Sequence, residues 1–127
     1  MIKTKAIDHV CLWVRSLSEA KEYYEKVFGF VCAPKKEDET VLVIESDNVH
    51  FFLSECNNKN DIATKLLSKQ HISFEVESIN RVVKELKAFD ITGYDVGEVR
   101  FFVHNNYNWC EWRDPSGIRL ECVEKIK

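Results

Sequence analysis

The sequence DHVCLWVRSL, residues 8–17, returns 62 residues further along the chain as QHISFEVESI, residues 70–79. Each copy has a histidine in second place, an apolar alternation after it, and a serine at the point where a helical pattern begins. Alternation with a period of two is typical of a half-buried strand. The repeat therefore predicts a duplicated fold, with a site to which both copies contribute a histidine, His9 and His71.

The residues that follow the first copy predict a module of one strand, one helix and three further strands. Ser16 and Glu19 fit a capping box at the start of the helix, and Gly29 is placed to end it in a left-handed conformation. The expected strands cover residues 7–14, 30–33, 40–45 and 49–54. Pro34 is expected to end the second strand, and the charged run 35–39 to form a solvated turn.

The two faces of the first strand differ in character. Val10, Leu12 and Val14 make an aliphatic face, which should meet helices. The opposite face carries His9, Cys11 and Trp13. The histidine face is therefore expected to look away from the helices.

The second half repeats this order after a polar connector at residues 56–69. Asp114-Pro115-Ser116-Gly117 is a strong type I turn signal, with proline at i+1 and glycine at i+3. The apolar stripe of the expected helix consists of Ile79, Val82, Val83, Leu86 and Phe89, with Gly93 after it. The other expected elements are strands at 71–76, 109–113 and 118–123, extended chain at 94–99 and 100–103, and a polar loop at 104–108.

The expected fold is of the α+β class, in one domain of residues 1–127 made of module 1–58 and module 66–127. A module of about 60 residues is marginal as an independent folding unit. Two curved mixed sheets around a concave groove, with helices on the outer face, would let the modules share one interior.

Composition excludes several function classes. The net charge of −3 and the scatter of basic residues among acids give no footprint for nucleic acid. No apolar run is long enough to span a membrane, and residues 1–5 lack the apolar core of a signal peptide, so we expect a cytoplasmic protein. The five cysteines are odd in number and lack CxxC spacing, which favours buried, reduced thiols.

Four stretches of the chain resemble the vicinal oxygen chelate superfamily: IDHV at 7–10, YYEKVFGF at 23–30, QHISF at 70–74 and DPSGIRLE at 114–121. This superfamily includes glyoxalase I, extradiol dioxygenases, fosfomycin-thiol transferases and bleomycin-resistance proteins. The resemblance implies two βαβββ modules whose strands hold one divalent metal ion, with ligands at His9, His71 and Glu121. Two imidazoles and one carboxylate leave coordination positions open for substrate oxygens. Iron, manganese, nickel, cobalt and zinc all suit this set.

Departures from the family pattern argue against two of the reactions known in this superfamily. Glyoxalase I generally has a glutamate where Phe52 stands, so the resemblance favours a three-ligand site over a standard glyoxalase mechanism. The basic loop and C-terminal arginine segment usual in fosfomycin enzymes have no match here.

Strand parity places further side chains in the same pocket. The expected substrate-binding residues are Cys11, Trp13, Phe52, Ser73, Trp109 and Arg119. Glu111 and His50 are the expected catalytic residues, with Glu111 as general base, or else paired with Arg119 or Arg113. The two tryptophans either wall the groove or stack on a substrate ring.

The resulting hypothesis is a metal-dependent enzyme that binds a small substrate by direct metal–oxygen chelation, of lyase or thiol-transferase type. The alternatives are an extradiol dioxygenase and a metal-free protein that sequesters an aromatic or antibiotic ligand, as bleomycin-resistance proteins do. The resemblance also implies a homodimer in which one chain supplies His9 and the other supplies His71 and Glu121.

Overall fold

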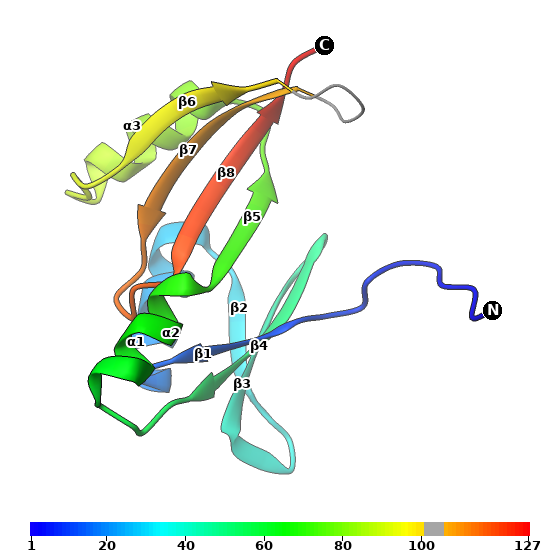
Figure 1. Cartoon of the computed structure of the whole chain (residues 1–127), viewed down its shortest axis with the longest axis vertical. Helices are drawn as coiled ribbons and strands as arrows, with labels where there is room; N and C mark the ends of the chain where they lie inside the picture. The colour runs from blue at the N-terminus through cyan, green and yellow to red at the C-terminus, as the bar shows by residue number, and fades with distance from the viewer. Residues whose placement is uncertain (101–105) are drawn as a thin grey trace. The chain divides into compact units, whose positions relative to one another are not determined.

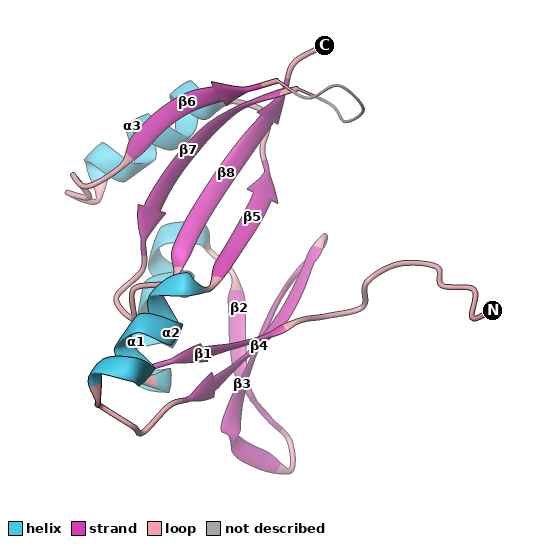
Figure 2. Ribbon diagram, in the orientation of Figure 1, coloured by secondary structure: helices cyan, strands magenta, loops and turns pink. Residues whose placement is uncertain are grey.

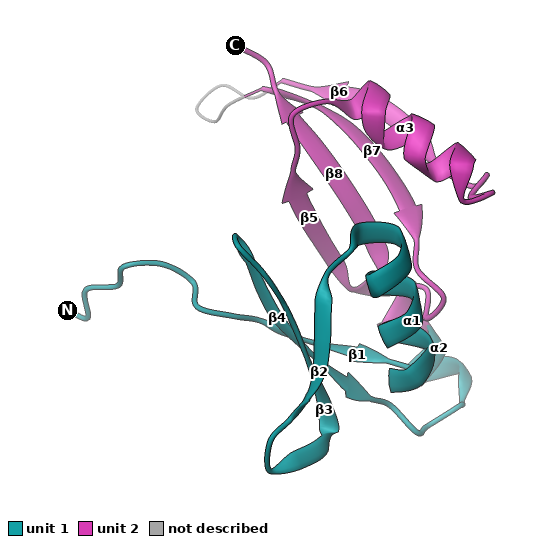
Figure 3. Ribbon diagram, turned by 180° about the vertical axis from the view of Figure 1, so that it is seen from behind, with its two compact units in different colours: residues 1–64 teal, residues 65–127 magenta. Residues whose placement is uncertain are grey.

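The computed structural model describes residues 1–100 and 106–127 of the chain. These residues form two compact units, 1–64 and 65–127, each built around its own four-stranded sheet (Figure 3). The two sheets have the same strand order and the same mixture of parallel and antiparallel pairs. The duplication expected from the sequence repeat is therefore present in the fold.

The first unit contains one helix and four strands in the expected order (Figure 1). They are β1 (Cys11–Val14), α1 (Leu17–Phe28), β2 (Val31–Lys35), β3 (Asp38–Ser46) and β4 (Val49–Glu55). The sheet order is β1-β4-β3-β2, with β1 parallel to β4 and the other pairs antiparallel. Strands β1 and β2 are the edges of this sheet.

Helix α1 begins and ends where its capping residues predict. The Ser16 side chain accepts a hydrogen bond from the Glu19 amide at 3.2 Å. Gly29 has φ 70°, and its amide reaches the carbonyl of Glu25 at 3.0 Å. A residue with a Cβ is strained at this φ, which explains the glycine.

The core of the first unit lies between α1 and one face of its sheet (Figure 2). Tyr24 of the helix and Phe51 of β4 are fully buried and meet edge to face, with ring centroids 5.8 Å apart. Val14 of β1 is also fully buried, whereas Trp13 is 54% exposed. Val14 of the predicted aliphatic face thus meets the core, whereas Val10 is 42% exposed, and the histidine face is left open.

The second unit repeats this arrangement. Its elements are β5 (His71–Glu75), α3 (Ile79–Ala88), β6 (Asp95–Val99), β7 (Tyr107–Arg113) and β8 (Arg119–Lys125). The order is β5-β8-β7-β6, again with one parallel pair, β5 and β8. Helix α3 packs against β7 and β8, with Leu86 buried in the interface.

A tight turn connects β7 and β8. The amide of Gly117 donates to the carbonyl of Asp114 at 3.0 Å, the bond that defines a β-turn. The buried Asp114 carboxylate accepts from the amides of Ser116 and Ile118, both at 2.9 Å. The predicted turn is confirmed, and it fixes the register in which β8 returns along the sheet.

Several predicted boundaries in the first half are wrong. Strand β1 starts at Cys11, four residues after the expected start, so His9 precedes the strand. The Val10 carbonyl still accepts from the Phe52 amide at 2.8 Å, which holds this segment beside β4. Pro34 lies inside β2, where the edge position tolerates the missing amide, and the charged turn shortens to residues 36–37.

The second half also departs from expectation. The polar connector contains a helix, α2 (Asp61–Lys69), with Ala63 and Leu67 buried. Helix α3 ends at Ala88 with Phe89 as its cap, and the next residue, Asp90, is left-handed with φ 58°. Tyr107 and Asn108 belong to β7 and not to a loop, because they pair with β6 and β8. Residues 101–105 of the expected extended chain and loop lie outside the described residues.

The predicted α+β class is confirmed by these two mixed sheets and their helices. Among the described residues, no helix is both long enough and apolar enough to cross a membrane.

Candidate metal centre

Strand pairing makes the two histidine segments equivalent. On β1 and β4, Cys11 pairs with Phe52. On β5 and β8, Ser73 pairs with Glu121. Each histidine comes two residues before the first member of its pair. Phe52 in the first half therefore occupies the register position that Glu121 occupies in the second half.

In the second unit, His71 and Glu121 face each other on the open side of the sheet. Nε2 of His71 lies 3.4 Å from Oε1 of Glu121. The glutamate is 5% exposed, whereas the histidine side chain is 39% exposed. A carboxylate so buried requires compensation by a positive charge or by hydrogen-bond donors.

Arg119 supplies part of that compensation. Its Nη2 lies 3.6 Å from Oε2 of Glu121 and contacts the carboxylate of Glu111. Arg119 pairs with His71 across β5 and β8, and Glu111 pairs with Glu121 across β7 and β8. The guanidinium therefore joins two carboxylates on one sheet face, and Glu111 is in the ion-paired state considered as the alternative to a free base.

In the first unit, the His9 ring is held on two sides. Its Nδ1 is 2.7 Å from Oδ2 of Asp8, and the hydrogen bond from His9 holds the pKa of the Asp8 carboxyl below its ordinary value. Phe52 stacks on the ring with centroids 4.2 Å apart and an interplanar angle of 27°. Sequence reasoning missed Asp8, although an acid next to a candidate ligand histidine is a visible signal.

The other expected residues of the first unit gather around His9. The rings of His50 and His9 have centroids 5.7 Å apart, and Nδ1 of His50 is 3.9 Å from Asp8 Oδ2. Sγ of Cys11 lies 3.5 Å from the hydroxyl of Ser54 on the same sheet face. His50, Cys11, Phe52 and the exposed Trp13 thus share the open face of the first sheet by register.

The corresponding face of the second sheet carries Ser73, Trp109, Glu111 and Arg119, as parity predicted. The indole ring of Trp109 lies against Gly97 of the neighbouring strand β6. A Cβ at position 97 would come within 2.5 Å of Cζ2 of the indole. The absence of a side chain at Gly97 therefore leaves the space over β6 that the Trp109 ring occupies.

The donors of the second unit fit a divalent metal ion. Metal–nitrogen and metal–oxygen bonds of about 2.0–2.2 Å that meet near the tetrahedral angle separate two donors by about 3.4 Å. This is the separation of His71 Nε2 and Glu121 Oε1. Within residues 1–100 and 106–127, no group of three or more His, Cys, Asp or Glu side chains is gathered for a metal. Of the three expected ligands, the described residues of the second unit thus bring together His71 and Glu121.

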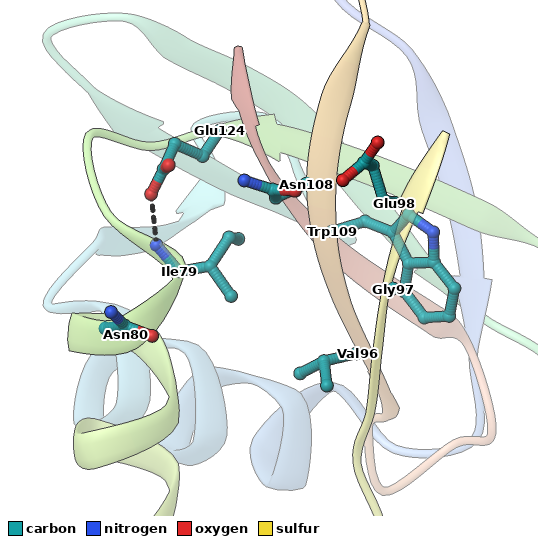
Figure 4. Close-up of a pocket in the computed structure, with 8 residues that line it drawn as sticks. All are labelled: Ile79, Asn80, Val96, Gly97, Glu98, Asn108, Trp109 and Glu124. Atoms are coloured by element: carbon teal, nitrogen blue, oxygen red, sulfur yellow. Dashed lines mark hydrogen bonds between the residues drawn. The ribbon is translucent and has the colours of Figure 1, made fainter. Parts of the chain in front are cut away.

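A pocket lies at the start of α3 (Figure 4). Its lining includes Asn80, Asn108 and Glu98 together with Trp109 and Val96. The remaining polar group, the Glu124 carboxylate, accepts a hydrogen bond from the Ile79 amide at 2.8 Å. That carboxylate serves the helix terminus, and none of the expected metal ligands lines the pocket.

Comparisons with known proteins agree with this fold. The sequence model of the Glyoxalase/Bleomycin resistance protein/Dioxygenase superfamily matches residues 6–122. A probable trivalent organoarsenical cleaving enzyme of Bacillus subtilis (strain 168) is 30% identical over 88 residues, which are 68% of this chain and 56% of that protein. The chain thus spans little more than half the length of that relative.

Two solved structures share the architecture at lower identity. A virulence protein from Salmonella typhimurium has a TM-score of 0.75 at 22% identity, over 98% of this chain and 100% of that one. The fosfomycin resistance protein FosX from Listeria monocytogenes, solved with Mn(II) and a sulfate ion, has a TM-score of 0.65 at 12% identity, over 98% and 93% of the two chains.

Proposed function

Because the chain belongs to the Glyoxalase/Bleomycin resistance protein/Dioxygenase superfamily, we propose that it is a metal-dependent enzyme of lyase or thiol-transferase type acting on a small substrate. The ligands in this proposal are His9, His71 and Glu121. The observation that carries it is the pair of His71 Nε2 and the buried Glu121 carboxylate at 3.4 Å. The Mn(II) in the FosX structure is consistent with a divalent ion in this fold.

The chemistry follows from the charge of the ligand set. A divalent ion bound by two neutral imidazoles and one carboxylate polarises substrate oxygens and stabilises negative charge that develops on them. Glu121 is held for this task by Arg119, which also contacts Glu111. Arg119 therefore contacts one oxygen of the proposed ligand carboxylate while the other oxygen faces His71.

Glu111 and His50 are the proposed acid–base residues. Glu111 lies beside Glu121 across β7 and β8, and its carboxylate contacts Arg119. We assign to it the exchange of a proton with the bound substrate. His50, in the position that Arg119 has in the other half, is the proposed second acid–base group.

Phe52 argues against a standard glyoxalase reaction. It occupies the register position of Glu121 and places an aromatic ring against His9 where a fourth ligand would stand. The open faces of the sheets supply Cys11, Trp13, Phe52, Ser73, Trp109 and Arg119 as proposed substrate contacts.

The proposed active form is a homodimer. The second unit offers only two ligands among its described residues, His71 and Glu121, so the site needs a third from elsewhere. We assign this role to His9 of another copy. Light scattering at micromolar concentration should give the mass of a dimer, and a monomer would contradict the assignment.

Cleavage of an organoarsenical is the second candidate, favoured by the 30% identity to the Bacillus subtilis protein. Trivalent arsenic is soft and prefers thiolate ligands. Cys110 and Cys122 pair across β7 and β8 but are fully buried on the helix side. Cys11 is exposed on an open sheet face, where its Sγ lies beside the Ser54 hydroxyl, and the half-buried Cys56 donates to the Asn58 carbonyl at 3.8 Å, so neither of these two thiols is seen beside another thiol. This candidate therefore ranks second.

Metal analysis of protein purified without chelator tests the proposal. We expect about one divalent ion per chain in the wild type, and close to none in His71→Ala and Glu121→Gln. Glu111→Gln is the matched control, because it changes a neighbouring carboxylate that is not a ligand and should retain the metal. A wild type free of metal that binds aromatic ligands would favour the sequestering protein instead. Ring-opening of a catechol with uptake of O₂ would favour the extradiol dioxygenase.

A further inference from the structure

The two histidines meet carboxylates through opposite ring nitrogens. His71 presents Nε2 to Glu121 at 3.4 Å. His9 presents Nδ1 to Asp8 at 2.7 Å. The two histidines are equivalent by strand register, so the difference lies in which side of the ring the carboxylate occupies.

The hydrogen bond to Asp8 selects one form of the His9 ring. A neutral imidazole carries its proton on one nitrogen and a lone pair on the other. With Asp8 ionised, the proton of His9 belongs on Nδ1, which donates to the carboxylate, and the lone pair is left on Nε2. This is the form that a metal ion requires if it binds Nε2.

The ring is also fixed in orientation. Phe52 stacks on its face at 4.2 Å, so the ring plane is set by the aromatic contact and its rotation by Asp8. In the second unit the residue before the histidine is Gln70, whose side chain donates to the Leu67 carbonyl at 3.4 Å. An acid directly before the histidine is thus a feature of the first half alone.

We propose that Asp8 is a positioning residue that holds His9 with Nε2 free to bind the metal. This inference rests on the proposed function, because it gives Asp8 a role through a ligand of that site. The Asp8 side chain is 82% exposed, so its contact orients the ring and adds little to folding stability. His50 also approaches the same oxygen at 3.9 Å, too far for a hydrogen bond that would compete.

The test compares Asp8→Ala and Asp8→Asn with Asp47→Ala in the full-length protein. Asp47 lies in the exposed turn between β3 and β4, so its replacement makes the same change in charge without touching a histidine. Nitrogen-15 NMR of the metal-free protein reports the protonated nitrogen of His9, with His9→Gln to assign the signal. Competition with a chromophoric chelator gives the affinity for Mn(II) and Zn(II).

We expect His9 to carry its proton on Nδ1 in the wild type and in Asp47→Ala, and to shift toward the Nε2 form in Asp8→Ala. Metal affinity should fall about 10- to 100-fold in Asp8→Ala and less in Asp8→Asn, whose amide oxygen still accepts a hydrogen bond. An unchanged His9 signal, or an affinity equal to that of Asp47→Ala, would overturn the inference while leaving the metal site intact. A wild type that binds neither ion, with the proton of His9 still on Nδ1, would instead overturn the proposed function. Asp8 would then orient the His9 ring without any role in metal binding.

Discussion

Phe52 and Glu121 occupy the same register position in the two halves of the chain. Phe52 lies opposite Cys11 and stacks on His9, whereas Glu121 lies opposite Ser73 and faces His71. The duplication has therefore produced unequal halves, one with a histidine against an aromatic ring and one with a histidine against a buried carboxylate.

A carboxylate at position 52 should supply a fourth protein ligand to the proposed metal site. In Phe52→Glu the new side chain starts from the strand position that directs Glu121 toward His71, so it should reach the metal bound by His9. We expect the affinity for Zn(II) and Mn(II) to rise about tenfold, equivalent to about 1.4 kcal/mol. Isothermal titration calorimetry on the metal-depleted protein measures this change.

Phe52→Gln is the matched control for this substitution, since it has the same length without the charge. Both variants lose the ring contact with His9, which should cost about 0.5–1.5 kcal/mol of stability. Equal metal affinities in the two variants would show that position 52 does not face the metal.

The thiols of Cys110 and Cys122 should be inert in the folded protein. Burial raises the pKa of Cys110 to about 11 and that of Cys122 to about 12, so both are protonated at pH 8. The thiolate is the reactive form. Brief treatment with iodoacetamide followed by mass spectrometry should find Cys11 alkylated, because it is exposed, and these two unmodified. Their alkylation at the rate of Cys11 would show that the second unit opens readily.

The same shifts predict how stability depends on pH. An unfolded thiol loses its proton near its ordinary pKa of 9.0, whereas the folded state keeps it. The folded state therefore binds more protons above pH 9, and the free energy of unfolding should fall between pH 9 and about 11, by at most about 1.4 kcal/mol per pH unit for each thiol. Below about pH 8 these thiols should give almost no dependence. Urea titrations of the wild type and Cys122→Ala should show a smaller slope in the variant.

Gly97 should be needed for the position of Trp109. A methyl group at 97 would lie 2.5 Å from Cζ2 of the indole, so the ring must move in Gly97→Ala. We expect a loss of about 1–3 kcal/mol, measured by urea denaturation, together with a change in tryptophan fluorescence. In a Trp109→Leu background the same substitution should cost far less. If the losses in the free energy of unfolding of the two single variants simply add in the double variant, the methyl group at position 97 does not act through the indole ring.

Much of the fold followed from local sequence signals. Ser16, Gly29 and the turn at Asp114 specify element ends through their own side chains or backbone freedom, and all three are confirmed. The connector helix α2 was missed although its apolar residues, Ile62 and Leu66, Ala63 and Leu67, recur at helical spacing. The apolar stretch is short and lies among polar residues, so it was interpreted as part of a polar connector.

The candidate metal centre could be predicted only in part from the sequence. Strand parity is a local property, so it placed His71, Glu111, Arg119 and Glu121 on one sheet face, as register confirms. Which side chains then pair depends on rotamers and burial that no sequence pattern encodes. The pairing of Glu111 with Arg119 was one of the alternatives from the sequence. The contacts of Arg119 with Glu121 and of Asp8 with His9 became visible only in three dimensions.

Two glutamates at equivalent strand ends should stabilise the two main helices independently. Glu55 accepts a hydrogen bond from the Leu17 amide at 3.1 Å, and Glu124 accepts one from the Ile79 amide at 2.8 Å (Figure 4). Each carboxylate satisfies an amide at a helix start, where negative charge is also favoured by the helix dipole. We expect Glu55→Ala and Glu124→Ala each to lower the free energy of unfolding by about 0.5–1.5 kcal/mol, and the Gln variants, which keep an acceptor oxygen, to lose less.

Because the two contacts lie in different units, the losses in the double Ala variant should add within about 0.5 kcal/mol in urea denaturation. Gln variants as unstable as the Ala variants would show that charge, and not the hydrogen bond, supports the helix ends.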